Sequence, residues 1–287
     1  SSWATRERAY RIIATTNIWQ NAAGSLVKIL LGLAMVKPGG LLIGQVVTQG
    51  GGTTSLVRGF LISFRANWHF VRWTRIRQLA KLYRSFPIYR APSQLLMVAS
   101  QQLPLLFMAA LYDIGTTGQF GLALMALALP VSLLANTTAN AFYAEAARLG
   151  VRRPAEIRGM LHSVLIRLAI IALPPALVLF FAGEWLIPIF LGPAWHQAAA
   201  FAATMSIYML FQFVQAPVAH IFYLFDGLRA LLFLNIQRIA LILVIFAVAY
   251  WLDLNAGALV LLYSILLGLH YGLSIIYAMR FIPEERR

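Results

Sequence analysis

The sequence predicts an all-α membrane protein, a polytopic bundle of about eight transmembrane helices. The prediction rests on an apolar composition, on apolar runs of membrane-spanning length, and on basic residues gathered on one side. Of the 287 residues, 61% are hydrophobic and 11% are charged, whereas a soluble domain carries about 25% charged residues. Water cannot accommodate this much apolar surface, but a lipid bilayer can.

The apolar runs have the length of membrane spans, which need about 20 mostly apolar residues each. The weakest is the second, because its apolar part from Leu41 to Val47 is short and a polar stretch follows it. It is retained because removing it would break the alternation of basic loops. The predicted spans are residues 12–35, 39–60, 92–112, 117–143, 161–183, 197–225, 230–251 and 256–279.

Basic residues indicate the orientation of these spans. With eight spans, 19 of the 23 Lys and Arg residues fall on one side, three fall inside spans, and only Lys37 falls on the other side. Cytoplasmic loops are enriched in Lys and Arg, so both chain ends are expected in the cytoplasm. The net charge of +14 then reflects loops that face anionic lipids, and no nucleic-acid partner is expected.

The strongly basic segment 58–90 divides the chain. It contains eight basic and no acidic residues, and it separates a two-helix part, residues 1–57, from a six-helix part, residues 91–287. As a helix along the cytoplasmic interface it would bind anionic lipids; alternatively, it is only a topological signal and linker. Because the sequence starts at Ser1 without a methionine, the true start is expected upstream.

The sequence lacks the residue patterns of catalytic and metal sites. The absence of cysteine excludes disulfides, thiolate metal sites and Cys nucleophiles. The five histidines form no clustered ligand pattern, and the acidic residues lie in loops or near helix ends, so no carboxylate pair is placed for acid–base chemistry. We therefore expect a protein that is not an enzyme and that needs no cofactor or metal.

Three basic residues fall inside predicted spans: Lys28, Arg167 and Arg238. Each costs about 2.5–3.5 kcal/mol at the centre of a span, and no acidic residue lies deep in a span to pair with them. Facing a shared cavity, they would bind an anionic group such as a phosphate. Alternatively, their long side chains reach the membrane interface from about two helical turns away.

Uncharged polar residues also lie inside the spans, where they suit sugar hydroxyls in a wet cavity. They equally suit hydrogen bonds between helices, which contribute about 0.6 kcal/mol each. Prolines recur in the same spans and are expected to bend them. The candidate substrate-binding amides are Asn17, Asn21, Gln101, Gln102, Asn136 and Asn140, and Gln212 and Gln215 lie in the sixth span.

Five short sequence stretches stand in a characteristic order and spacing. They are Lys81-Leu-Tyr-Arg-Ser-Phe-Pro87, Gln102-Leu-Pro104, Thr117-Gly-Gln-Phe-Gly-Leu-Ala123, Leu129-Pro130 and Phe190-Leu-Gly-Pro-Ala-Trp195. Together they resemble the Wzx-type polysaccharide-biosynthesis flippases of the multidrug/oligosaccharidyl-lipid/polysaccharide exporter superfamily.

The resemblance implies a two-lobe, MATE-like transporter of the bacterial inner membrane that works by alternating access. Such proteins move undecaprenyl-diphosphate-linked oligosaccharide to the periplasmic leaflet, for O-antigen or exopolysaccharide synthesis, beside glycan polymerases and assembly proteins. Since the family usually has twelve or more spans, this chain would hold the last two helices of the first lobe and all of the second.

Two other functions are compatible with the sequence. A multidrug or small-molecule exporter of the same superfamily should place acidic and aromatic residues in its spans to bind cationic drugs, and the lack of buried acids argues against it. A non-transporting scaffold would use segment 58–90 to hold glycan-assembly enzymes at the membrane.

Overall fold

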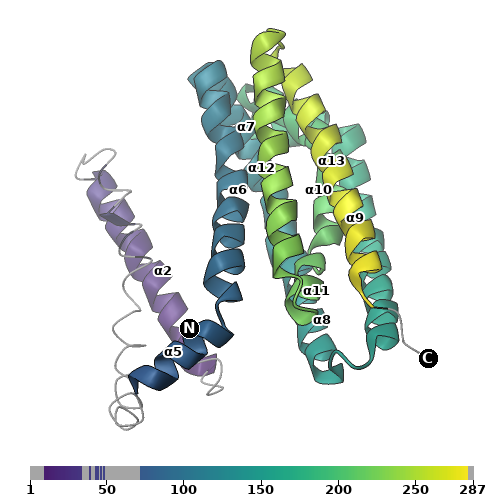
Figure 1. The fold of residues 1–287 in the computed structure, drawn as a ribbon. Helices are drawn as coiled ribbons and strands as arrows, with labels where there is room; N and C mark the ends of the chain where they lie inside the picture. The colour runs from purple at the N-terminus through teal and green to yellow at the C-terminus, as the bar shows by residue number, and fades with distance from the viewer. Residues whose placement is uncertain are drawn as a thin grey trace. The chain divides into compact units, whose positions relative to one another are not determined.

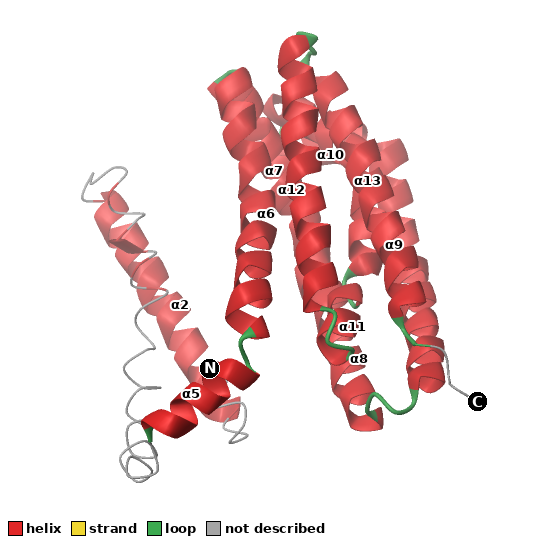
Figure 2. Cartoon of the chain, in the orientation of Figure 1, coloured by secondary structure: helices red, strands yellow, loops and turns green. Residues whose placement is uncertain are grey.

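The regular structure of the protein is helical throughout the part of the chain that the structure, a computed structural model, describes (Figure 2). That part comprises residues 10–33, five separate positions between 39 and 48, and residues 72–283. Six of its helical stretches are long and apolar enough to cross a membrane. The predicted all-α membrane bundle is confirmed, while most of the predicted span 39–60 lies outside the described residues.

The chain forms two compact units, Ser1–Leu82 and Tyr83–Arg287. In the first unit, α2 (Tyr10–Leu33) overlaps the predicted span 12–35. Also in this unit, α5 (Trp73–Leu82) lies in the basic segment and has no buried residue. Part of the basic segment is therefore helical.

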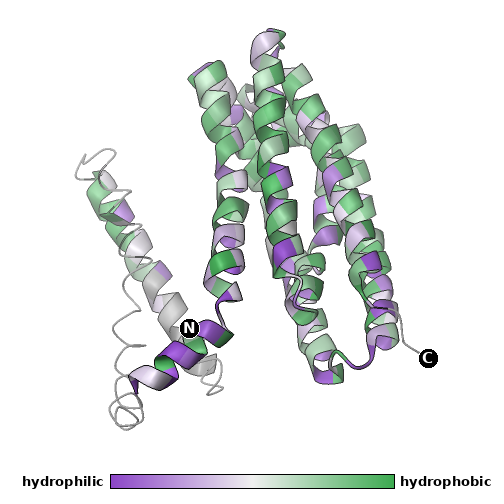
Figure 3. Ribbon diagram, viewed as in Figure 1, coloured by the Kyte–Doolittle hydropathy of each residue, from purple (hydrophilic) through white to green (hydrophobic). Residues whose placement is uncertain are grey.

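The second unit contains the six long apolar stretches, which form an up-and-down bundle (Figures 1 and 3). Each stretch overlaps one of the predicted spans from the third to the eighth. The stretches are Phe86–Leu111, Ile114–Leu149, Pro154–Leu191, Pro193–Leu224, Leu228–Trp251 and Ala256–Phe281.

Several stretches are divided into shorter helical elements. Two short π-helices interrupt the regular helices, one before α6 and one between α7 and α8. The elements are η2 (Phe86–Arg90), α6 (Ala91–Leu111), α7 (Ile114–Pro130), η3 (Val131–Ala135), α8 (Asn136–Leu149), α9 (Pro154–Leu191), η4 (Pro193–Trp195), α10 (His196–Gln215), α11 (Val218–Leu224), α12 (Leu228–Trp251) and α13 (Ala256–Phe281).

Prolines divide two of the spans, while α6, with Pro104, and α9 stay continuous. The π-helix η3 directly follows Pro130, and Pro217 lies between α10 and α11, because proline supplies no backbone N–H to the helix. In contrast, α9 continues through Pro174, Pro175 and Pro188. In a membrane, neighbouring helices and local changes in helix geometry can compensate for the backbone hydrogen bonds that proline removes.

The end of α9 differs from the sequence-based expectation. The predicted span 161–183 ends eight residues before the helix does. α9 extends to Leu191, and only Pro193–Trp195 forms a separate short 3₁₀ helix. The break comes at Gly192, whose φ of +93° lies in a region that glycine enters without a steric penalty.

The most buried helix is α10, which packs against α9, α13 and α7. Its first turns are rich in alanine, including the buried Ala198, Ala199, Ala202 and Ala203. Small residues let helix backbones approach closely in a membrane, where packing rather than the hydrophobic effect holds helices together. Gly183 of α9 is one such contact, since a Cβ built there would lie 3.4 Å from the Cβ of Ala203.

Hydrogen bonds join separate helices at both ends of the bundle. At the end that contains Trp195, the Tyr112 hydroxyl donates to the Leu254 carbonyl (2.7 Å). At the opposite end, which contains Ile282, Arg158 donates to the Ile282 carbonyl (2.6 Å). These bonds span more than a hundred residues of sequence and tie the connecting segments to the bundle.

Gln119 of α7 makes a double contact with the start of α10. Its Nε2 donates to the Ala194 carbonyl (2.7 Å), and its Oε1 accepts from the Ala198 N–H (3.0 Å). The first N–H groups of a helix have no acceptor within that helix. Gln119 supplies an acceptor for the Ala198 N–H from a neighbouring helix.

We predict that Gln119→Glu destabilises the protein by about 0.5–1.5 kcal/mol, because the carboxylate cannot donate to the Ala194 carbonyl and this exposed hydrogen bond is lost. Thermal unfolding in detergent measures the effect. The control Gln197→Glu makes the same change at an exposed position in the first turn of α10, where negative charge is tolerated. Equal melting temperatures for the two variants would contradict the role of Gln119.

Asp113 caps the start of α7. The Thr116 hydroxyl (2.6 Å) and the Thr116 N–H (2.9 Å) donate to its carboxylate. These bonds favour the ionised form and hold the Asp113 pKa below its usual value. The stabilisation is therefore present above the unfolded-state pKa of about 3.9 and is lost as the pH falls through the lower folded-state pKa.

We predict that Asp113→Asn lowers the melting temperature at pH 7 and that the difference from the unmodified protein shrinks toward pH 3. Thermal unfolding across this pH range measures both. The control Asp226→Asn changes an exposed turn aspartate that makes no hydrogen bond or ion pair within the described residues. A pH-independent difference for Asp113→Asn would rule out the ionised cap.

Candidate functional site

A cavity of about 810 Å³ lies within the second unit. Its walls come from α6, α7, α10, α12 and α13, with contributions from the start of α8 and from η4. It is large enough for a small organic ligand or a part of a larger one. Its polar lining consists of Ser100, Gln101, Gln102, Thr117, Asn136, Tyr208, Gln212, Arg238, Tyr263 and Tyr271.

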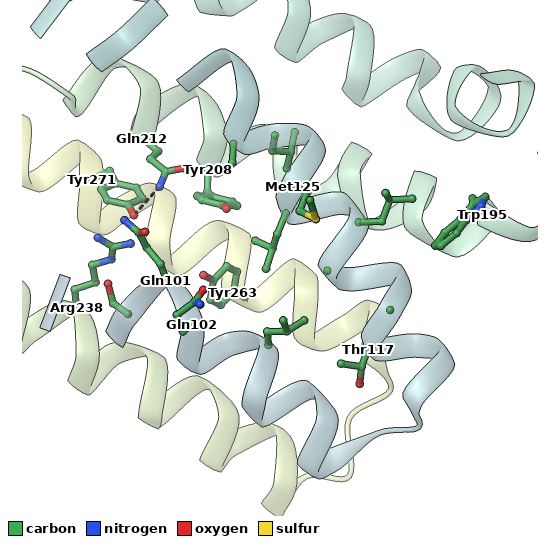
Figure 4. A pocket seen from close by; sticks show the side chains of 18 of the residues that line it. Gln101, Gln102, Thr117, Met125, Trp195, Tyr208, Gln212, Arg238, Tyr263 and Tyr271 are labelled. Carbon is green, nitrogen blue, oxygen red and sulfur yellow. Dashed lines mark hydrogen bonds between the residues drawn. The ribbon is translucent and has the colours of Figure 1, made fainter. Parts of the chain in front are cut away.

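The two ends of the cavity differ in chemistry. Figure 4 shows Arg238, Gln101 and Gln212 close together at one end, with Trp195 and Thr117 at the other. Aliphatic residues and methionine line the part beside α7, namely Ile114, Leu122, Leu124, Met125 and Leu127. The cavity can therefore hold a ligand that is anionic and polar at one end and less polar at the other.

Arg238 of α12 is the cation of this cavity. Its side chain is 8% exposed, and its guanidinium carbon lies 5.3 Å from the centre of the Tyr271 ring. The Nε atom is buried without a hydrogen-bond partner. No ion pair among the described residues involves Arg238. The two ion pairs found there join exposed neighbours in sequence, one within α8 and one at the start of α9.

A buried cation without a carboxylate partner needs compensation. Moving this charge out of water is costly. The cation–π contact with Tyr271 contributes about 2 kcal/mol or more when it is desolvated, and this offsets only part of that cost. A guanidinium also stays ionised under all physiological conditions. Arg238 therefore presents a permanent positive charge to the cavity, as an anion site requires.

Three tyrosines pack around this cation. Tyr208 of α10 lies edge-on to Tyr263 of α13 at 5.6 Å and parallel to Tyr271 at 6.3 Å. Gln212 donates to the Tyr271 hydroxyl at 3.4 Å, as the dashed line in Figure 4 shows. The hydroxyls of Tyr208 and Tyr263 make no hydrogen bond within the described residues, so they are available to a ligand in the cavity they line.

The structure brings together four of the residues predicted from sequence: Arg238, Gln101, Gln102 and Asn136 all line the cavity. Two others do not line it, since Arg167 of α9 and Asn140 of α8 are exposed elsewhere on the second unit.

The remaining candidates lie on α2 in the first unit. They are Lys28, Asn21 and Asn17, and the side chain of Asn17 is outside the described residues. Their part in substrate binding stays a prediction.

Sequence reasoning missed the tyrosines and Trp195 as site residues and did not include Gln212 among its candidates. A helical pattern could have indicated them, because Tyr208 and Gln212 are four residues apart and Tyr263 and Tyr271 are eight apart, spacings that place residues on one face of a helix. Within residues 10–33 and 72–283, no three His, Cys, Asp or Glu side chains lie together.

Comparison with known proteins identifies the family. Residues 1–200 match the family described as Polysaccharide biosynthesis protein. The chain belongs to this family. The match confirms the resemblance to the Wzx-type polysaccharide-biosynthesis proteins, and the six apolar helices make the chain a multi-pass membrane protein with a role in polysaccharide biosynthesis. Neither the curated proteins nor the solved structures gave a match.

The matched region and the cavity overlap only in part. Residues 1–200 supply the α6, α7 and α8 walls, including Gln101, Gln102 and Asn136. Arg238 and the three tyrosines come from α10, α12 and α13, beyond residue 200. The family match thus covers Gln101, Gln102 and Asn136 of the cavity lining, while Arg238 and the three tyrosines lie outside the matched residues.

We predict that Arg238→Met does not lower the stability of the protein, because no carboxylate is left unpaired and the cost of burying a charge disappears. Thermal unfolding in detergent measures this. Arg158→Met is the contrasting variant, since it removes the bond to Ile282 and should lower the melting temperature. A large loss of stability in Arg238→Met would instead make Arg238 a structural residue.

Proposed function

We propose that this protein is a membrane transporter that flips undecaprenyl-diphosphate-linked oligosaccharide from the cytoplasmic to the periplasmic leaflet by alternating access. The observation that carries the proposal is Arg238, a buried arginine that has no carboxylate partner among the described residues and that lines a cavity of about 810 Å³. Membership of the polysaccharide biosynthesis family supports the class of substrate.

The cavity suits the two parts of such a head group. A guanidinium binds phosphate oxygens through paired N–H donors, and its attraction for an anion is strong where water is scarce. The Tyr208 and Tyr263 hydroxyls and the Gln101, Gln102 amides both donate and accept hydrogen bonds, which matches the hydroxyls of a sugar. The chain's own part is binding and reorientation rather than bond chemistry, so we propose that it is not an enzyme.

The distribution of charge supports an orientation in the bacterial inner membrane. The Ile282 end of the second unit carries the arginines of the loops and helix ends: Arg84, Arg90, Arg148, Arg152, Arg153, Arg158, Arg229 and Arg280. At the Trp195 end, the described residues of this unit include Asp113, Glu184 and Asp253 but no Lys or Arg. From the positive-inside rule we propose that the Ile282 end of this unit faces the cytoplasm, which agrees with the orientation predicted from the sequence.

The same charges weigh against an exporter of cationic drugs. A cationic substrate would meet Arg238 at the polar end of the cavity, and like charges repel strongly in a medium of low polarity. The described residues offer no acidic side chain in the cavity lining to bind it.

We predict that Arg238→Gln lowers export of surface polysaccharide about tenfold or more, because a charge-assisted hydrogen bond of 1.5–3 kcal/mol is lost. The measurement is surface polysaccharide in cells whose only copy of the gene carries the variant, normalised to the amount of protein in the membrane.

The control for this experiment is Arg167→Gln. It makes the same change at an exposed arginine of α9 that does not line the cavity, so export should stay near its normal level. Normal export by Arg238→Gln would contradict the proposed site. A change in drug susceptibility with unchanged polysaccharide export would favour the exporter.

A further inference from the structure

A second group of cations lies at the Ile282 end of the bundle, away from the cavity. Two arginines and three aromatic rings from η2, α11 and α12 form this group, which we name the arginine–aromatic cluster: Phe86, Tyr89, Arg90, Tyr223 and Arg229. None of these residues lines the cavity.

Each arginine lies against an aromatic ring. The guanidinium carbon of Arg90 is 4.6 Å from the centre of the Tyr223 ring and 5.6 Å from that of Phe86. That of Arg229 is 5.2 Å from the centre of the Tyr89 ring. Because Tyr89 and Arg90 are neighbours in η2, and α12 packs against η2, the two guanidinium groups belong to one small region of the surface.

These contacts leave the hydrogen-bonding capacity of both arginines unused. A cation–π contact does not consume the N–H groups of a guanidinium. Within the described residues, neither Arg90 nor Arg229 takes part in a hydrogen bond or an ion pair. Asp226, in the turn before α12, is the nearest acidic residue in sequence and forms no ion pair with Arg229. Two oriented cations are therefore available to an anion.

His220 packs against one of the aromatic rings of the cluster. The His220 ring stacks on Tyr143 of α8 at 4.8 Å and meets Tyr223 edge-on at 5.9 Å. Its Nδ1 is buried and has no partner within the described residues. The Tyr223 ring, on which Arg90 rests, thus packs against His220 of its own helix, and His220 in turn stacks on α8. A pre-ordered ring limits the entropy that is lost when Arg90 binds a ligand.

An apolar surface continues from the cluster into the membrane-spanning part. On α12, Phe233 and Ile236 follow Arg229 by four and seven residues, so all three lie on one face of the helix. Phe233 is 64% exposed and Ile236 is 49% exposed. Ile88 of η2 is exposed as well. A charged head group at the arginines would therefore have apolar protein surface beside its hydrocarbon chains.

We propose that the arginine–aromatic cluster binds the phosphate of an anionic bilayer phospholipid, with the acyl chains along Phe233 and Ile236. The site is distinct from the substrate cavity, and its occupancy does not depend on the proposed transport activity. The phosphate accepts hydrogen bonds from Arg90 and Arg229, and the aromatic rings hold both guanidinium groups in place.

The experiment is thermal unfolding of the full chain in detergent with increasing dioleoyl phosphatidylglycerol, compared with dioleoyl phosphatidylcholine. A ligand that binds the folded state raises the melting temperature, so phosphatidylglycerol should raise it more than phosphatidylcholine does. In the double variant Arg90→Gln/Arg229→Gln, half-maximal stabilisation should need roughly 30-fold more phosphatidylglycerol, since each basic residue near a lipid surface contributes about 1 kcal/mol.

The matched control is the double variant Arg152→Gln/Arg280→Gln, which removes two exposed arginines outside the cluster and should respond to phosphatidylglycerol as the unmodified protein does. The single variant Arg229→Gln replaces the cluster double variant if that variant does not fold. Equal responses of the cluster and control variants would overturn the proposal.

A further arm uses undecaprenyl diphosphate in place of the phospholipid. If the cluster variants lost their response to undecaprenyl diphosphate but kept their response to phosphatidylglycerol, the cluster would be a substrate site, and the proposal of a resident phospholipid would be wrong. This outcome would leave the role of Arg238 untouched, because polysaccharide export in Arg238→Gln tests it separately.

Discussion

The close packing of α10 against α9, α13 and α7 is the contact on which the second unit depends. Buried alanines of α10 allow the helices to approach closely. In a bilayer, side-chain packing rather than the hydrophobic effect holds helices together. Tyr208 and Gln212 of α10 line the cavity. α13 packs against α10, and its Tyr263 and Tyr271 lie beside Tyr208 in the same wall. α6 packs mainly against α12, and the cavity lies between this pair and the α10 group.

The arginines of the second unit serve different electrostatic purposes. Arg148 and Arg153 pair with glutamates three residues away on the surface, where such pairs contribute little. Arg90 and Arg229 rest on aromatic rings at the Ile282 end, with their donors unused. Arg238 is buried in the bundle. The arginines of this unit thus differ in burial and in what each contacts: a glutamate, an aromatic ring or the cavity.

The prolines show how a membrane bundle tolerates broken helices. Each removes a backbone donor, a loss that lipid cannot compensate. The chain places these breaks where other elements are near: η3 after Pro130 contacts α10 and α8, and Pro217 between α10 and α11 is buried. Both divisions lie close to the cavity, since Ala128 and Asn136 flank η3 and Gln212 comes shortly before Pro217, and all three residues line it.

The sequence by itself determined the class of the fold, the positions of the six long spans, the one-sided distribution of charge and the family. The first three follow from apolar length, composition and charge, which depend on local sequence, and the family follows from the match over residues 1–200. Only the tertiary structure decided which polar residues meet. Arg167 and Arg238 carry the same signal in sequence, yet one is exposed on α9 and the other is buried in the cavity. Periodicity indicates which face a residue occupies on its helix, but packing between distant segments determines what that face contacts.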